Sequence, residues 1–320
     1  PFLPSPTGPV PEHLESSVGI ESKLIWMDGE LVPFDQANVH VLSHTLHYGL
    51  GVFEGIRSYR QPGGGGGIFK LDGHIRRLMD SAKMCRMEIP FSAEQLRDAC
   101  IQTLQVNEFD EAYIRPIVFL GSSQMGLGAR GNPVHVAIAT WKWGAYLGED
   151  GMQKGIRTAT SSFTRHHVNA NLQRAKVIGH YVNSILAKYE ANDNGFDEAI
   201  MLDQHGNVAE GTGENLFVIR DGIVKTPPTV NILAGLTRRT AIDILAKDGI
   251  QVREMPFGRD ALYVADEIFM TGTAAEITPI REVDRRAVGE PGPITRRVQQ
   301  TYLDGVRGRV DWMRPYITTY

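Results

Sequence analysis

The sequence predicts a two-domain protein of mixed α/β and α+β character. The chain has 320 residues, more than one ordinary domain of roughly 100–200 residues. Strand-like runs rich in β-branched and aromatic residues recur along it, and segments with the apolar spacing of helices lie between them. We expect a flexible arm over residues 1–22, a smaller domain over 23–147, a connector over 148–155 and a larger domain over 156–320.

The first predicted element is a β-hairpin. Two apolar segments in KLIWMDGELVPF, residues 23–34, flank Asp28-Gly29, a pair that favours a tight hairpin turn. The next strand, GIFKL over 67–71, follows the proline and five glycines of 62–67. Ordering successive glycines costs much conformational entropy, so we expect a surface loop there, not a phosphate-binding loop.

Two helices and two strands complete the predicted first half. The spacing of apolar residues predicts the first helix. Ser92 and Gln95 are placed to form a capping box at the start of the second. The strands are rich in β-branched and aromatic residues, which indicates burial. The helices are expected over residues 72–87 and 92–106, and the strands over 112–121 and 133–148.

The second half is predicted to be rich in antiparallel strands. A strand over 156–162 and a helix over 174–191 precede a meander over 197–228, whose turns fall at His205-Gly206-Asn207 and Asp221-Gly222. No strand followed by a GxGxxG helix start is present, which disfavours a dinucleotide-binding fold.

Composition excludes several classes of partner. The net charge is −4 and no basic stripe is present, so we expect no nucleic-acid partner. Cys85 and Cys100 are the only cysteines, too few for a disulfide framework and without metal-site spacing. No apolar run reaches the roughly 18–20 residues that cross a bilayer, and no signal pattern opens the chain. We therefore expect a cytoplasmic protein that binds no membrane and no metal.

Two lysines, Lys176 and Lys188, lie in the predicted helix RAKVIGHYVNSILAKYEA. Neither shares its apolar face, which we expect to be half-buried and which comprises Ile178, Val182, Ile185, Leu186 and Tyr189. Lys188 has polar neighbours typical of a solvated lysine. Lys176 lies among Ala175, Val177 and Ile178, where lost solvation would lower the pKa of its amine and make it a usable nucleophile. Taken alone, either lysine could be a surface residue.

An acidic partner for such a lysine could come from VAEGTGENLF, residues 208–217. Glu210 and Glu214 lie there in a glycine-rich corner between strand-like runs. In isolation they could be exposed turn carboxylates. A glycine-rich corner also lets a backbone approach a planar ligand closely.

Two further turns could bind an anion. Gly235, Leu236 and Thr237 open a predicted helix, where free amides and a hydroxyl can hold a phosphate, although the threonine could simply cap the helix. Residues 272–275 form a second turn of small residues after a strand. One lysine, one acid and two phosphate-type turns are the components of a pyridoxal-phosphate site.

The combined motifs resemble the fold-type IV pyridoxal-phosphate enzymes, and within them the branched-chain amino acid aminotransferases. The resemblance extends from about Leu24 to Tyr302, nearly the whole chain. Its motifs are HYGLGVFEGIR (His47 to Arg57), HIRRL, AYIRP, MGLG, WGAYLG, AKVIGHYVNS, EGTGENLF, GLTR and GTAAEITP. It implies a cofactor, pyridoxal 5'-phosphate, bound between the two domains.

The resemblance also implies a role for each matching residue. Lys176 would be the catalytic Schiff-base lysine, Glu210 the partner of the pyridine nitrogen, and Tyr181 a hydrogen-bond donor to the phenolic oxygen. The phosphate would be held by Arg77, Leu236, Thr237 and Thr273. The substrate would be bound by Tyr48, Phe53, Tyr113, Arg115, Trp143, Tyr146, Ala274 and Ala275.

These roles predict transamination between branched-chain L-amino acids and 2-oxoglutarate. Arg115 would offer a planar fork to glutamate's side-chain carboxylate, and the aromatic residues would receive aliphatic side chains. The resemblance implies a homodimer or a higher homo-oligomer, in which one subunit often completes its neighbour's pocket. Two departures from the family pattern are His180, where many relatives have asparagine, and the polyglycine insertion. His180 could alter hydrogen bonding to the phenolic oxygen or serve only in packing.

Alternatives remain within and outside the fold. D-amino acid aminotransferases, R-selective amine transaminases and aminodeoxychorismate lyase keep the lysine and the glutamate but alter the substrate-side motifs. A pyridoxal-phosphate binding protein without catalytic activity is a rival of another class.

Overall fold

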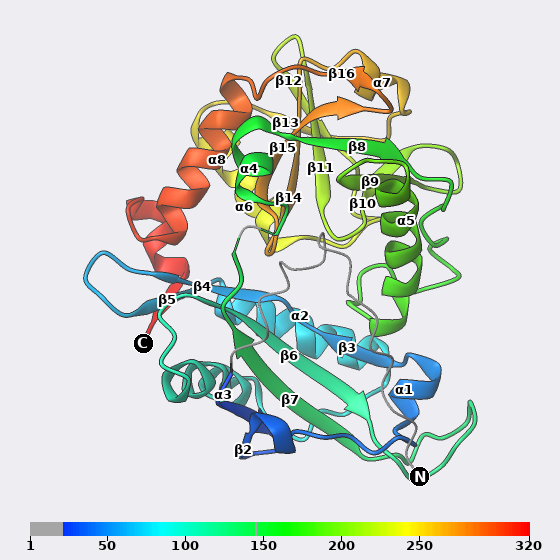
Figure 1. The fold of residues 1–320 in the computed structure, drawn as a ribbon, viewed down its shortest axis with the longest axis vertical. Helices are drawn as coiled ribbons and strands as arrows, with labels where there is room; N and C mark the ends of the chain where they lie inside the picture. Colours follow the sequence, from blue (N-terminus) through cyan, green and yellow to red (C-terminus); the bar gives the residue numbers. More distant parts are fainter. Residues whose placement is uncertain (1–21, 145) are drawn as a thin grey trace, which may run out of the picture.

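A computed structural model describes residues 22–144 and 146–320 (Figure 1). The predicted N-terminal arm lies, except for Ser22, outside the described residues. Two β-sheets with their covering helices form the lower and upper parts of the view in Figure 1. Among the described residues, no helix combines the length and the apolar composition that a membrane crossing requires.

The first sheet contains the early strands and the last one. Its order is β17-β5-β4-β6-β7-β1-β2, and β3 pairs with β6 off this path. Helices α2 and α3 cover it, and Leu78, Leu96 and Val118 are fully buried in the core between them. The elements are β1 (Leu24–Met27), β2 (Glu30–Pro33), η2 (Phe34–Gln36), α1 (His44–Tyr48), β3 (Gly51–Phe53), β4 (Ile56–Arg60), β5 (Gly66–Phe69), α2 (Leu71–Met84), α3 (Ala93–Val106), β6 (Ala112–Leu120), β7 (Val134–Trp141) and β17 (Ile317–Thr319).

The second sheet mixes parallel and antiparallel pairs. Its order is β10-β9-β8-β15-β14-β11-β12-β13, and β16 pairs with β15. Its elements are α4 (Glu149–Lys154), β8 (Ile156–Thr160), η3 (Ile178–His180), α5 (Tyr181–Asp193), β9 (Glu198–Leu202), β10 (Val208–Gly211), β11 (Asn215–Arg220), β12 (Ile223–Thr226), α6 (Leu236–Lys247), β13 (Val252–Glu254), α7 (Asp260–Tyr263), β14 (Glu267–Gly272), β15 (Glu276–Val283), β16 (Arg286–Ala287), α8 (Pro293–Val306) and η4 (Asp311–Tyr316).

A shared apolar cluster joins the two sheets. Tyr59 and Phe69 of the first sheet pack with Phe217, Phe269 and Tyr302 of the second part, and the rings of Phe69 and Tyr302 meet edge to face with centroids 5.9 Å apart. Strand β17 also carries the end of the predicted larger domain into the first sheet, where it pairs with β5. The domain boundaries at 147 and 156 stay a prediction.

Several local predictions are confirmed. Strands β1 and β2 pair as an antiparallel hairpin around Asp28-Gly29, and Ser92 and Gln95 form the expected capping box. The predicted meander is only partly present, since β9 pairs with β10 and β11 with β12, but β11 pairs with β14 and not with β10. The strand predicted to reach residue 148 ends at Trp141, and the Trp143 and Gly144 carbonyls instead accept hydrogen bonds from Arg57.

The predicted surface loop over 62–67 is wrong at its end, since β5 begins at Gly66, one residue before the predicted strand start at Gly67. Gly66 and Gly67 are buried in β5. A Cβ atom on Gly66 would collide with the ring of Tyr320, and one on Gly67 would meet Gln61 and Ile317 at 2.5 and 2.6 Å. The close packing of the C-terminal strand against β5 therefore explains why glycine suits these positions.

The predicted helix over 174–191 also differs from the structure. Helix α5 begins at Tyr181, after the short helix η3, so Lys176 lies before it in a non-helical segment. The face predicted to be half-buried faces outward instead, with Val182 and Tyr189 each 61% exposed. The small residues Ser184, Ala187 and Ala191 are the buried ones. Periodicity identified the apolar face of the helix but not the surface against which it packs.

Candidate active site

A cavity of about 410 Å³ brings together residues from both sheets. Its walls contain all but two of the residues predicted to form the site. These are Phe53, Arg77, Tyr113, Arg115, Trp143, Tyr146, Lys176, Tyr181, Glu210, Leu236, Thr237, Thr273 and Ala274.

Lys176 is held by backbone contacts with the first sheet. Its N–H donates to Ser81 Oγ at 3.0 Å, and its carbonyl accepts the Phe53 N–H at 3.1 Å. Its Nζ lies 2.5 Å from the Tyr181 hydroxyl and 4.9 Å from the centre of the Phe53 ring. The amine therefore projects into the cavity between two aromatic side chains.

Lys188 does not line this cavity, and the expectation that it is simply solvated is wrong. Its Nζ lies 2.7 Å from Oε2 of the fully buried Glu198, and its side chain is 21% exposed. Glu198 lies ten residues further along the chain on β9, so the sequence neighbours of Lys188 could not indicate this ion pair.

Glu210 is 4% exposed on β10 and has three polar partners. Arg165 Nη2 lies 2.7 Å from its Oε1, and Asn215 Nδ2 and the Leu233 N–H donate to its Oε2 at 3.1 and 3.3 Å. Burial raises the pKa of Glu210 above its ordinary value, and Arg165 opposes that rise. The sequence interpretation missed Arg165, because it lies in an irregular segment remote from the acid.

Two helices form a cradle suited to a phosphate. Gly235 caps α6 without a side-chain hydrogen bond, so the first amides of that helix, at Leu236 and Thr237, are available to a ligand. Arg77 of α2 lies on the same cavity wall, and its Nη1 donates to the Ala234 carbonyl at 3.1 Å. The arrangement combines free amides, a hydroxyl and a guanidinium.

Arg77 is held by Glu54, which the sequence interpretation did not single out although it lies in the motif VFEGIR. Arg77 Nε and Nη2 donate to the two Glu54 oxygens at 2.6 and 2.9 Å. His74 Nδ1 lies 2.7 Å from the same carboxylate. Burial alone would raise the pKa of Glu54, but the charges and hydrogen bonds of Arg77 and His74 hold it well below the ordinary value.

Aromatic rings form another wall around Arg115. Its guanidinium carbon lies 4.7 Å from the centre of the Phe53 ring and 5.4 Å from that of Tyr113. The rings of Tyr113 and Trp143 meet edge to face at 4.6 Å, and Trp143 meets Tyr146 at 5.5 Å. This wall is apolar with one cation set among the rings, which suits aliphatic side chains and carboxylates alike.

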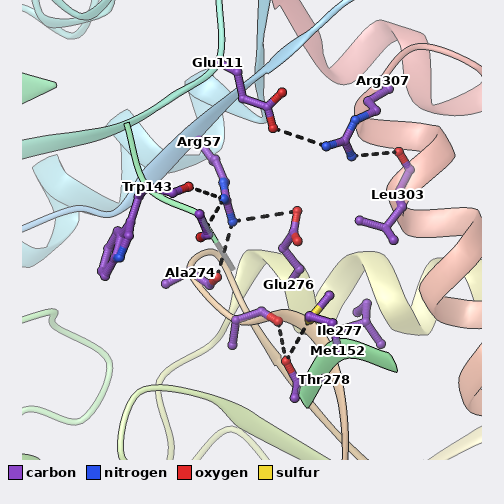
Figure 2. Close-up of polar contacts among 12 residues, drawn as sticks. Arg57, Glu111, Trp143, Met152, Ala274, Glu276, Ile277, Thr278, Leu303 and Arg307 are labelled. Atoms are coloured by element: carbon purple, nitrogen blue, oxygen red, sulfur yellow. Dashed lines mark hydrogen bonds and ion pairs between the residues drawn. The ribbon is translucent and has the colours of Figure 1, made fainter. Parts of the chain in front are cut away.

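Arg57 links two residues of the cavity wall, Trp143 and Ala274, through the contacts drawn in Figure 2. Its Nη2 donates to the Trp143 carbonyl at 2.6 Å, and its Nη1 donates to the Ala274 carbonyl at 3.3 Å. The same Nη1 lies 3.8 Å from Glu276 Oε1. Arg57 thus links the loop of Trp143 to the turn of Ala274 through its Nη1 and Nη2 donors.

Tyr48 and Ala275 are the two predicted residues outside the cavity wall. Tyr48 ends α1, is 43% exposed, and accepts the Gly126 N–H through its hydroxyl at 3.2 Å. Ala275 is buried, and its carbonyl accepts the Thr278 hydroxyl at 2.6 Å. The family resemblance suggested both residues, but in this chain the backbone turns at Gly49, between Tyr48 and the strand that carries Phe53.

His180 lines the cavity beside Tyr181 and is 6% exposed. Burial, with His166 and Arg165 nearby, lowers its pKa to about 4, so the ring is neutral near pH 7. The centre of the His166 ring lies 5.3 Å away. A contact between His180 and a cofactor stays a prediction.

The residues present fit pyridoxal phosphate. An amine, a carboxylate and an anion cradle lie on one cavity, as this cofactor requires. Within the described part of the chain, Arg165 Nε, Gln173 Oε1 and His180 Nε2 are buried without a hydrogen-bond partner. Polar atoms of a cavity wall that lack a hydrogen-bond partner are typical of a surface that receives a ligand. No cluster of described side chains is suited to hold a metal ion.

Comparison with known proteins agrees with this geometry. The sequence model of the family described as amino-transferase class IV matches residues 51–283. The branched-chain-amino-acid aminotransferase of Pseudomonas aeruginosa is 52% identical over 290 residues, covering 90% of this chain and 94% of that protein. The Escherichia coli K12 protein of the same name is 44% identical over 291 residues, with coverages of 90% and 94%.

Solved structures show the same fold. The Escherichia coli branched-chain amino acid aminotransferase superposes with a TM-score of 0.91 at 42% identity, covering 93% of this chain and 99% of that one. The enzyme of the same name from Thermobaculum terrenum, solved in its PLP-form, gives a TM-score of 0.87 at 34% identity, with coverages of 94% and 99%.

Proposed function

Because this chain belongs to the class IV aminotransferase family and is an enzyme, we propose that it transfers the amino group between branched-chain L-amino acids and 2-oxoglutarate with pyridoxal 5'-phosphate as cofactor. The observation that carries the proposal is the single cavity that combines the Lys176 amine, the Glu210 carboxylate and the anion cradle of α6. The products would be branched 2-oxo acids and glutamate.

The cofactor, when bound, supplies an electron sink that stabilises negative charge at the substrate's α-carbon. Lys176 would hold the cofactor and would also be the group that moves the proton at the substrate's α-carbon. The Tyr181 hydroxyl, 2.5 Å from the Lys176 amine, would donate to the cofactor's phenolic oxygen. Glu210 would favour the protonated pyridine nitrogen by direct charge pairing. Arg77, Leu236, Thr237 and Thr273 would hold the phosphate.

One pocket serves both substrate types in this proposal. The rings of Phe53, Trp143 and Tyr146 receive an aliphatic side chain, and Arg115 receives the second carboxylate of glutamate. Tyr113 and the turn at Ala274 and Ala275 receive the α-carboxylate that all substrates share. The Ala274 carbonyl is already bonded to Arg57, which supports a fixed orientation of this turn.

The alternatives of the same fold are less well supported. The relatives at 52% and 44% identity are named branched-chain-amino-acid aminotransferases, not D-amino acid or amine transaminases. A protein that only binds the cofactor would not require the Lys176 and Tyr181 pair or the paired Glu210. These residues together favour an enzyme.

We further propose a homodimer or a multiple of it. Helix α5 exposes Val182 and Tyr189, and Leu46 on α1 is 63% exposed. The residue after α1 contacts the short helix before α5, because the Gly179 N–H donates to the Gly49 carbonyl at 3.0 Å. Exposed apolar side chains on both helices support a subunit interface. In such a dimer Tyr48 would reach the neighbouring subunit's pocket, in keeping with its position outside its own.

A cytoplasmic location is also proposed. Cys85 and Cys100 are both free, which suits a reducing compartment.

The direct test is an assay of the purified protein with pyridoxal 5'-phosphate and 2-oxoglutarate. L-leucine, L-isoleucine and L-valine should each yield glutamate and the matching 2-oxo acid. D-leucine and an R-configured arylalkyl amine are the comparison donors. Turnover with either comparison donor but not with L-leucine would overturn the substrate assignment, and no turnover with any donor would overturn the enzymatic one.

A further inference from the structure

Glu214 is a buried acid of the cavity wall that the proposed function does not use. It is 3% exposed, and its Oε2 accepts the Gly213 N–H at 3.1 Å. It forms no ion pair within the described residues. A buried carboxylate without a cationic partner is costly to ionise.

This acid lies beside the first residue of the turn proposed to receive the substrate's α-carboxylate. A Cβ atom built on Gly272, which opens that turn, would be 3.4 Å from Glu214 Cγ and 3.5 Å from the Gly213 carbonyl oxygen. The start of the 272–275 turn therefore packs against residues 213 and 214. A negative charge on Glu214 would act on an anion bound above the turn.

Burial and the neighbouring acids favour the protonated form of Glu214. Lys188 on α5 opposes them, but its ammonium is bound to Glu198 of β9, which also accepts the Thr212 hydroxyl at 2.8 Å. Glu210 on β10 adds a like charge and is itself paired with Arg165. Lys188 is thus paired with Glu198 and not with Glu214.

Burial and the neighbouring acids both raise the pKa of Glu214. Burial, followed by the Glu198 charge, raises the pKa of Glu214 to about 8, while Lys188 opposes the rise. Tyr146, in the loop before α4, faces the same acids. Burial and the charges of Glu214 and Glu198 raise the pKa of its phenol well above the ordinary value. Near pH 7 this corner therefore contains a protonated acid and a protonated phenol.

We propose that Glu214 is a specificity-determining residue that admits a carboxylate ligand at the 272–275 turn only while it carries a proton. The inference rests on the proposed function, because it takes this turn as the site of the α-carboxylate. In alkaline solution the ionised acid repels the ligand. A neutral ligand of the same shape is not affected.

The test compares 4-methylpentanoate with its neutral amide as ligands of the holoenzyme, by isothermal titration calorimetry from about pH 6.5 to about pH 9.5. The carboxylate, which has no amino group to titrate, should lose affinity by about tenfold per pH unit above the midpoint, since only the protonated enzyme binds it. The amide should bind equally across the range. An equal alkaline loss for both ligands would overturn the inference.

Two variants assign the effect to this acid. Glu214→Gln, a neutral isostere, should retain affinity for the carboxylate at alkaline pH. Glu198→Gln should move the loss to lower pH, because it removes a like charge and frees Lys188 to pair with Glu214. Glu149→Gln, in α4 and exposed, is the matched control and should behave as wild type. Cofactor content and unfolding temperature establish that each variant is folded.

The outcomes separate this inference from the function on which it rests. An alkaline loss that persists in Glu214→Gln, or no alkaline loss in the wild type, contradicts the role of Glu214 and leaves transamination untouched. Failure of the carboxylate to bind at pH 7 contradicts the proposed function and this inference together. If Glu214→Gln does not fold, the Glu198→Gln variant decides alone. If its affinity for the carboxylate then falls at the same pH as in the wild type, the inference is contradicted.

Discussion

Lys176 and Lys188 lie twelve positions apart, yet their surroundings differ in kind. The Lys176 amine contacts Tyr181 and the face of the Phe53 ring, whereas the Lys188 amine is paired with Glu198. An amine without an acidic partner can bond to a carbonyl carbon, whereas an ion-paired ammonium has no free electron pair to do so. This contrast is the residue-scale basis of the proposed role of Lys176.

The two acids of EGTGENLF should differ sharply in their effect on the reaction. Glu210→Gln should slow both half-reactions by at least about a hundredfold, because an amide cannot hold the pyridine nitrogen protonated. Glu214→Gln should have a much smaller effect at pH 7, because the amide resembles the protonated acid. Single-turnover rates, read from the absorption bands of the cofactor, measure both variants. Equal losses in the two variants would mean that Glu210 does not hold the pyridine nitrogen protonated.

Arg115 should distinguish the two substrates that share the pocket. Arg115→Met should impair the glutamate half-reaction about ten- to a hundredfold more than the leucine one, since a hydrogen bond to a charged group contributes roughly 1.5–3 kcal/mol. Leucine presents no second carboxylate. If both amino acids lose reactivity equally, Arg115 binds the shared α-carboxylate or supports the fold. Arg57 is less suited to take its place, because its Nη2 and Nη1 already donate to the Trp143 and Ala274 carbonyls.

At the scale of elements, the buried acid Glu54 connects the first sheet to the residues of the proposed phosphate site. Glu54 follows β3 and binds Arg77 and His74 of α2, and Arg77 in turn reaches the Ala234 carbonyl just before α6. Three elements distant in sequence are thereby fixed around the proposed phosphate site.

This arrangement predicts a specific loss of stability in acid. The folded-state pKa of Glu54 is depressed below its ordinary value of 4.5, so its contribution is present above that pH and is lost as the pH falls. Glu54→Gln should lower the free energy of unfolding at pH 7 by about 3 kcal/mol, because Arg77 is left buried without its partner. Its stability should then depend less on pH as the pH falls from about 5 to about 2, where the wild type loses this contribution. Urea unfolding measures this, and parallel pH profiles for variant and wild type would contradict it.

At the scale of the whole molecule, the unburied face of α5 is the feature that a single chain does not explain. Val182→Glu should convert the proposed dimer to monomers, because it sets a charge in an apolar interface. Val264→Glu is the matched control, since Val264 is 58% exposed, close to the 61% of Val182. Val264 follows α7, which lies at the top of the view in Figure 1. Light scattering gives the mass of each. A wild-type monomer, or a dimer in both variants, would rule out this interface.

Local signals in the sequence predicted much of the fold. The Asp28-Gly29 hairpin and the Ser92 capping box depend on neighbouring residues, and both are confirmed. Long-range packing could not be predicted in the same way. Gly66 and Gly67 lie in a strand because the distant C-terminal residues pack on them, and α5 turns its small residues inward against β9. Periodicity cannot show which partner an apolar face will meet.

The same distinction holds for the candidate site. Lys176, Glu210 and the 272–275 turn lie in distinctive motifs, so the sequence could nominate them. Arg165 and Glu54 act through partners remote in sequence, and only the folded chain brings them together.

The central claim is that Lys176 carries the cofactor. Reduction of the holoprotein with sodium borohydride, followed by peptide mapping, fixes the attached group to its lysine and reads its position directly. The label should appear on Lys176, and Lys176→Ala should remain folded, bind the cofactor without covalent attachment and show no transamination. Label on Lys188, or near-normal turnover in Lys176→Ala, would contradict the account.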